Sequence, residues 1–122
     1  MQQTLLPLAA RSLIAALFLV AGVRKILFFS LQVAYFTRLG FPFPEAFTVL
    51  AILAEVGGAA LLIAGWRTRE AAWVLIVFTL VATFMAHRFW EFDPAQSANQ
   101  MNHFLKNLAI IGGLLMLTTK RT

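Results

Sequence analysis

The apolar positions of this chain fall into four long stretches that are separated by shorter, more polar connections. The stretches run from about 5 to 27, 45 to 65, 70 to 90 and 102 to 119. At about 1.5 Å per residue, helices of these lengths are close to or above the roughly 30 Å of a bilayer's hydrocarbon core. Backbone groups inside a bilayer must hydrogen-bond to one another, so each stretch is expected to be a helix. The pattern predicts an all-α integral membrane protein, an antiparallel four-helix bundle that forms a single domain over residues 1–122.

The connections between the stretches add detail to this bundle. The first, FFSLQVAYFTRLGFPFP, interrupts its aromatic and leucine positions with Gln32 and Arg38, which predicts a short helix lying in the interface plane. Pro42 and Pro44 then end that helix and turn the chain into the second stretch. The second connection, WRTRE, is a tight turn, so the second and third stretches must be antiparallel neighbours.

Composition excludes several classes of protein. Hydrophobic residues make up 61% of the 122 positions, against roughly 45–50% in soluble domains, which excludes a soluble enzyme and a disordered chain. The formal net charge is +5, but the cations are spread along apolar stretches, which favours membrane anchoring over nucleic-acid binding. The chain has no cysteine, so disulfides, thiolate nucleophiles, iron–sulfur clusters and cysteine-bound zinc are excluded.

Two cations lie within the first apolar stretch. Arg11, Phe18, Gly22 and Lys25 fall on one side of a helix at 100° per residue. A charge at mid-span costs on the order of 3 kcal/mol, so such residues need a partner or a route to water. Either the two cations extend to opposite interfaces, or they belong to a polar stripe that faces the interior of the bundle.

Glu55 is about ten residues from either end of the second stretch. Its short side chain cannot reach water from that depth, so it must pair with a cation, line a wet cavity or stay protonated. Arg11 and Lys25 are the candidate partners. Gly58 and Gly65 lie on the same side of the helix and would allow another helix to approach closely. Each alternative places Glu55 in the interior of the bundle.

Two histidines and two polar residues lie near the third connection. His87 ends the third stretch, and His103, Lys106 and Asn107 begin the fourth, which places all of them on the same side of the bundle as Lys25. Their spacing matches no metal-binding motif, and no metal site is predicted. Two histidines on different helices can be the axial ligands of a haem, but the chain has no haem-attachment motif. Haem is therefore not expected.

Five segments together resemble the DoxX family of small membrane proteins. They are ARSLIAALFLVAGVRKI, LGFPFP, LAEVGGAALLIAGW, FMAHRFW and NHFLKNLAIIGGLLML, in matching order over nearly the whole chain. The resemblance implies four transmembrane helices and a relationship to the small subunit of a thiosulfate:quinone oxidoreductase. The positions that correspond to the family's pattern are Arg11, Phe18, Gly22, Lys25, Glu55, Gly58, Gly65, His87, His103, Lys106 and Asn107. Other four-helix proteins in the wider relationship act through cysteines, so electrons here would have to pass through a cofactor, a quinone or a partner.

These observations predict that the protein is a small inner-membrane subunit of an oxidoreductase system and that it binds a quinone or another lipophilic molecule in the bundle. The predicted catalytic residues are Glu55 and His87. The predicted cofactor-binding residues are Arg11, Lys25, His103, Lys106 and Asn107. The alternative is a non-catalytic membrane adaptor, chaperone or small-solute carrier, whose polar stripe only holds the helices together. The cofactor is not identified, and the predicted partners are the lipid bilayer, a redox partner protein or subunit and a second copy of the chain.

Charge near the connections also predicts an orientation. The N-terminus, the turn that carries Arg67 and Arg69, and the tail that carries Lys120 and Arg121 share one side of the bundle. Short basic turns and tails are typical of the cytoplasmic face. Both termini are therefore predicted to lie in the cytoplasm.

Overall fold

The computed structural model describes residues 2–86 and 89–119, and its described residues are helical with short connections and no strand. This confirms the all-α prediction. The elements are α1 (Gln2–Leu27), α2 (Phe29–Arg38), α3 (Pro44–Ile52), the π-helical segment η1 (Leu53–Gly57), α4 (Gly58–Ala64), α5 (Thr68–Ala86), the 3-10 segment η2 (Phe89–Glu91) and α6 (Pro94–Leu117). Segments α3, η1 and α4 follow one another without a break and form one long helical unit.

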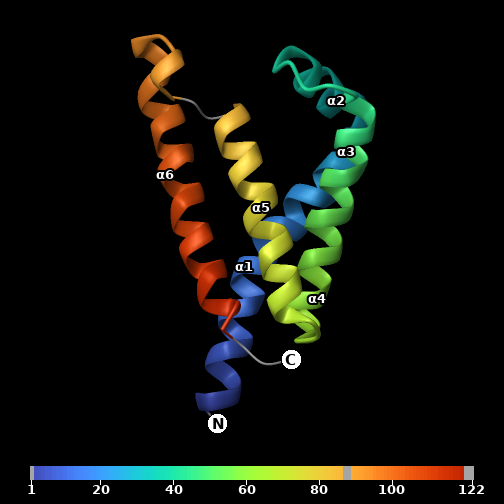
Figure 1. The fold of residues 1–122 in the computed structure, drawn as a ribbon, viewed down its shortest axis with the longest axis vertical. Coiled ribbons are helices and arrows are strands. Elements are labelled where there is room, and N and C mark those ends of the chain that lie inside the picture. The colour runs from blue at the N-terminus through green and yellow to red at the C-terminus, as the bar shows by residue number, and fades with distance from the viewer. Residues whose placement is uncertain (1, 87–88, 120–122) are drawn as a thin grey trace.

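The long helices run along the long axis of the molecule (Figure 1). The beginning of α1, the turn between α4 and α5, and the end of α6 lie at one end, whereas α2 and the beginning of α6 lie at the other. The Arg69 Nε donates a hydrogen bond of 2.9 Å to the Thr118 carbonyl oxygen and so ties the start of α5 to the end of α6. The grouping of the N-terminal end, the Arg67–Arg69 turn and the end of the last helix is thereby confirmed.

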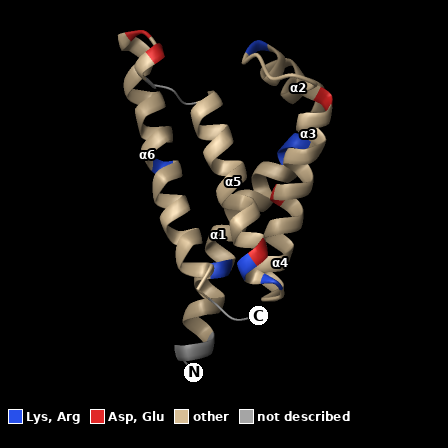
Figure 2. Cartoon of the chain, viewed as in Figure 1, with Lys and Arg blue, Asp and Glu red and all other residues tan. Residues whose placement is uncertain are grey.

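Three segments of the described residues are long and apolar enough to cross a membrane. They are Leu5–Leu27, Pro44–Ala64 and Thr68–Ala86. Helix α6 has 24 residues but is not among them, because its first half is rich in polar residues. The fourth span, and with it the four-helix membrane bundle, therefore stays a prediction. Most charged residues lie toward the two ends of the molecule, with a few within the helices (Figure 2).

The buried core is concentrated where α1, α4, α5 and α6 meet. Its buried residues are Ala15, Phe18, Ala59, Leu62, Ala71, Ala72, Leu75, Ile76, Leu114 and Leu117. Small residues bring these helices close: a Cβ atom added at Gly58 would lie 2.9 Å from Leu75 Cγ. Helices in lipid associate through such close packing rather than through exclusion of water. The close approach predicted for Gly58 is confirmed.

An aromatic cluster holds α2 against α3. The ring centroids of Phe36 and Phe41 are 4.8 Å apart, and those of Phe41 and Phe47 are 4.3 Å apart. Pro44 occupies the first turn of α3, where its missing N–H costs nothing. The short helix predicted after the first span is therefore present, and the cluster fixes its position beside the long helical unit.

Candidate functional site

Glu55 lies in the π-helical turn η1, in the middle of the second long helical unit. A π-turn widens the helix by one residue, and such bulges are frequent at functional sites. Gly57 ends this turn and Gly58 follows it, and neither has a side chain to obstruct the wider turn. Glu55 is only 4% exposed, so its carboxylate is held inside the protein.

The partner of this carboxylate is Lys25 of α1. The Lys25 Nζ lies 2.8 Å from the Glu55 Oε1, and the two side chains are 15% and 5% exposed. Gly22, one turn earlier on α1, makes the approach possible: a Cβ atom there would lie 2.6 Å from Val56 Cγ2 and 3.3 Å from Glu55 Cβ. The ion pair and the interior-facing stripe predicted for α1 are confirmed, with Lys25 rather than Arg11 as the partner.

Arg11 has a different role, at the C-terminal end of α4. Its Nε donates a hydrogen bond of 2.8 Å to the Leu62 carbonyl oxygen. Helix α4 ends there at Gly65, whose φ of 73° is the left-handed conformation usual after a helix. A cation stabilises this end because the helix dipole and the last carbonyls are negative. At 1.5 Å per residue, Arg11 lies about 21 Å along α1 from Lys25, so the structure does not bring it to Glu55.

A cavity of about 210 Å³ adjoins the ion pair. Its polar lining comes from five elements and comprises Lys25, Gln32, Tyr35, Glu55, Thr79 and Asn107. Its apolar lining comprises Leu17, Phe18, Ala21, Phe36, Phe78, Ala82, Ala86 and Ile110. A small space of this kind, mostly apolar with a few converging polar groups, is typical of a ligand site.

Two threonines of α5 show how the polar groups in this cavity are supported. The Asn107 Nδ2 donates to the Thr83 Oγ1 at 3.0 Å, and the Thr83 Oγ1 donates to the Thr79 carbonyl oxygen at 2.6 Å. This chain of bonds fixes the Asn107 amide. The Thr79 hydroxyl, by contrast, is buried and has no hydrogen-bond partner among the described residues. A buried hydroxyl without a partner costs about 1–3 kcal/mol, so Thr79 is available to bind a molecule in the cavity.

Tyr35 adds a second hydroxyl at the α2 side of the cavity. Burial raises the pKa of the Tyr35 phenol from its ordinary value of 10.0, and the nearby Arg38 guanidinium opposes this rise. The phenol is therefore protonated throughout the neutral range. A protonated phenol both donates and accepts hydrogen bonds.

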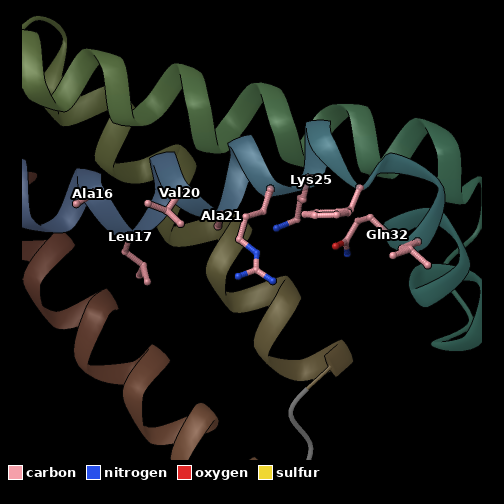
Figure 3. A pocket seen from close by; sticks show the side chains of 9 residues that line it. Ala16, Leu17, Val20, Ala21, Lys25 and Gln32 are labelled. Atoms are coloured by element: carbon pink, nitrogen blue, oxygen red, sulfur yellow. The ribbon is translucent and has the colours of Figure 1, made fainter.

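A larger groove, of about 810 Å³, lies beside the cavity along α1 and the start of α2. Figure 3 shows Ala16, Leu17, Val20, Ala21 and Lys25 in a row along α1, ending at Gln32 of α2. The groove also includes Arg24, Phe28 and Leu31. It is open at the surface of the molecule, whereas the cavity next to it extends inward to Glu55.

The structure unites three of the residues that the sequence predicts for the site, namely Lys25, Glu55 and Asn107. His103 is half-buried and Lys106 is exposed on α6, and neither lines the cavity. His87, which the sequence also predicts for the site, lies outside the described residues. For Arg11, the observed contact is with the end of α4.

Sequence reasoning missed Gln32, Tyr35 and Thr79. Gln32 and Tyr35 are three residues apart and therefore share one face of α2, a signal that was present in the sequence. Thr79 and Thr83 are four residues apart and share a face of α5, in a stretch without charged residues. Without the fold, nothing indicated that these two faces meet at Glu55.

The apolar helices, the buried ion pair and the adjoining polar cavity define a helical membrane protein with a candidate small-molecule site. The family model for DoxX matches residues 6–88, and the chain belongs to the DoxX family. It is 32% identical over 110 residues to the inner membrane protein YphA of Escherichia coli K12, a match that covers 90% of this chain and 79% of YphA. The inner membrane protein YqjF of the same organism is 36% identical over 110 residues, with the same coverage of both chains. No solved structure matches the chain.

Proposed function

We propose that this protein is an inner-membrane subunit of an oxidoreductase system that binds a quinone or a similar small lipophilic molecule in the cavity beside Lys25 and Glu55. The observation that carries the proposal is a buried ion pair that adjoins a cavity with an unpaired hydroxyl, Thr79. Buried charges inside a membrane are costly and usually mark a functional pathway. Its relatives YphA and YqjF are inner membrane proteins, which supports the location.

The chemistry of the cavity suits a quinone and its reduced form. The carbonyl oxygens of a quinone accept hydrogen bonds, which Thr79, Tyr35 and the Lys25 ammonium are able to donate. The hydroxyl groups of a quinol donate, and the Glu55 carboxylate accepts. In this proposal Glu55 exchanges a proton with the ring when the redox state of the quinone changes. The electrons would come from a bound cofactor or from a redox partner protein, because the chain has no cysteine of its own.

The direct test is binding of a short-chain quinone to the purified protein. We expect saturable binding, and a bound quinone in organic extracts of protein purified in mild detergent. Thr79→Val keeps the shape and removes the hydroxyl, so it should weaken binding by about 3- to 10-fold, the equivalent of one hydrogen bond. The matched control is Thr37→Val, since the Thr37 hydroxyl bonds within its own helix at an exposed position. Absence of saturable binding in the wild-type protein would contradict the proposal.

A second candidate function is a non-catalytic adaptor, chaperone or carrier in which the charges only hold helices together. It is favoured by one observation: Arg11 and Lys25 both have partners inside the protein. The two functions differ in what happens when Lys25 and Glu55 are neutralised together. An adaptor would keep its cellular activity, whereas a quinone-binding subunit would lose it.

The proposed orientation places both termini in the cytoplasm. The exposed Ala98 near the start of α6 would then face the opposite side of the membrane. Because the chain has no native cysteine, Ala98→Cys gives one labelling site. Impermeant thiol reagents should label it from outside intact spheroplasts, and labelling only after the membrane is opened would reverse the orientation.

A further inference from the structure

The cavity and the groove share part of their lining. Leu17, Ala21, Lys25 and Gln32 belong to both, so the space beside Glu55 continues into the open groove on the outside of α1. Three further α1 residues of the groove, Ala16, Val20 and Arg24, do not line the cavity. The part of the groove lined by Ala16 and Val20 therefore extends the cavity along α1, away from the ion pair (Figure 3).

The chemistry of the groove changes along its length. Its α1 wall is apolar from Ala16 to Ala21, and Arg24, Lys25 and Gln32 supply polar groups at the other end. The apolar wall is within Leu5–Leu27, a segment long and apolar enough to span the membrane, and Val20 is 58% exposed. An exposed face in the middle of a membrane span contacts acyl chains rather than water. A molecule that reaches the cavity along this wall comes from the bilayer.

The geometry points to a ligand with two parts: a polar head in the cavity and an apolar tail that lies in the groove against α1. This inference rests on the proposed function and narrows its ligand class to tailed amphiphiles that enter laterally from the bilayer. From Lys25 back to Ala16 the wall is about 14 Å long at 1.5 Å per residue. The occupant is thus a lipid-soluble redox carrier with a hydrocarbon tail, rather than a small water-soluble molecule.

The test compares two quinone analogues with the same ring, one with a decyl tail and one with a methyl group in its place. For each protein variant the measured quantity is the ratio of the two dissociation constants, in one detergent at one concentration. Partition of the tail into micelles then affects every variant equally and cancels between variants. Ala16→Phe adds a large side chain at a position that lines the groove and not the cavity. Ala60→Phe is the matched control, because Ala60 is exposed on α4 and lines neither space.

We expect Ala16→Phe to reduce the preference for the tailed analogue by about tenfold, since losing the burial of two methylene groups is sufficient for that change. The methyl analogue should bind Ala16→Phe as it binds the wild-type protein, and Ala60→Phe should change neither analogue. Equal preference in both variants and the wild type would overturn the tail site while leaving the quinone site intact. Equal loss of both analogues in Ala16→Phe would also overturn it, and thermal unfolding of each variant identifies a folding defect. A wild-type protein that binds neither analogue would refute the proposed function itself.

Discussion

Helix α1 carries two inward-facing cations, Arg11 in its first half and Lys25 near its C-terminal end, and the two have different surroundings. Arg11 donates to the last turn of α4, next to the residues that form the buried core. Lys25 pairs with Glu55 beside a cavity that opens to the outside. We call these regions the closed end and the open end. At the closed end the polar contact completes the hydrogen bonding of a helix terminus, whereas at the open end charge and empty space occur together.

A charge inside a membrane span is therefore not by itself evidence of function. The helix face does not separate Arg11 from Lys25, since both lie on the same side of α1. The partner and the adjoining space do separate them. A backbone carbonyl that accepts from Arg11 remains a structural contact, whereas a carboxylate next to a cavity can respond to a bound molecule.

The largest effect is expected from breaking the open end. Glu55→Gln keeps the size of the side chain and leaves the Lys25 ammonium buried without its carboxylate. Breaking such a pair typically costs about 3–5 kcal/mol, which would appear as a large fall in thermal stability in detergent. Unchanged stability and unchanged quinone binding would show that the ion pair between Lys25 and Glu55 contributes to neither.

The double variant Lys25→Met with Glu55→Gln sharpens this result. It leaves no stranded charge, so most of the lost stability should return. Binding of the quinone analogue should stay weakened, because the Lys25 ammonium and the Glu55 carboxylate, two of the groups proposed to contact the ring, are gone. Recovery of both stability and cellular activity would favour the adaptor over the quinone-binding subunit.

A medium effect is expected from separating α1 from η1. A Cβ atom at Gly22 would lie 2.6 Å from Val56 Cγ2, a contact that real structures do not contain. Gly22→Ala should therefore shift α1 and lengthen the contact between Lys25 and Glu55, at a cost of about 1–3 kcal/mol for overpacking. Thermal unfolding and quinone titration should both change. Gly112→Ala is the control, since nothing lies within 4 Å of a Cβ atom there.

A smaller effect, confined to stability, is expected at the closed end. Arg11→Met removes the donor to the Leu62 carbonyl oxygen and the cation at the end of α4. The loss should be about 1–2 kcal/mol in thermal stability. Quinone affinity should stay at the wild-type value, because Arg11 does not line the cavity. A fall in affinity with unchanged stability would remove the distinction between the two ends.

The smallest effect concerns alkaline pH at the open end. The folded protein disfavours the Tyr35 phenolate, since burial raises the pKa of the phenol above 10.0. The stability linked to the protonated Tyr35 phenol is fully present below the pKa that the phenol has in the unfolded chain. It is lost as the pH rises through the pKa of the folded protein. Tyr35→Phe should therefore lose less stability than the wild type over that range. Tyr35 is the one tyrosine of the chain, so ultraviolet absorbance reports its ionisation directly, and a transition at or below the ordinary value would contradict this.

The sequence predicted much of the fold because its signals are local. The second stretch, from about 45 to 65, corresponds closely to Pro44–Ala64, and the short helix after the first span is present as α2. The fourth stretch shows the limit of this reasoning. Helix α6 forms, but its polar first half keeps it from being long and apolar enough to count as a span.

For the site, the sequence by itself determined that Glu55 must lie in the interior, because lipid does not solvate a charge and its short side chain cannot reach water from mid-span. It also determined that Gly22 and Lys25 share a face, since helical periodicity depends only on residue spacing. Only the tertiary structure decided that Lys25, and not Arg11, is the partner of Glu55. It also decided that Thr79 and Tyr35 line the same cavity. The distance between these two residues depends on how α2 and α5 pack, and the local spacing of residues along the chain has no information on it.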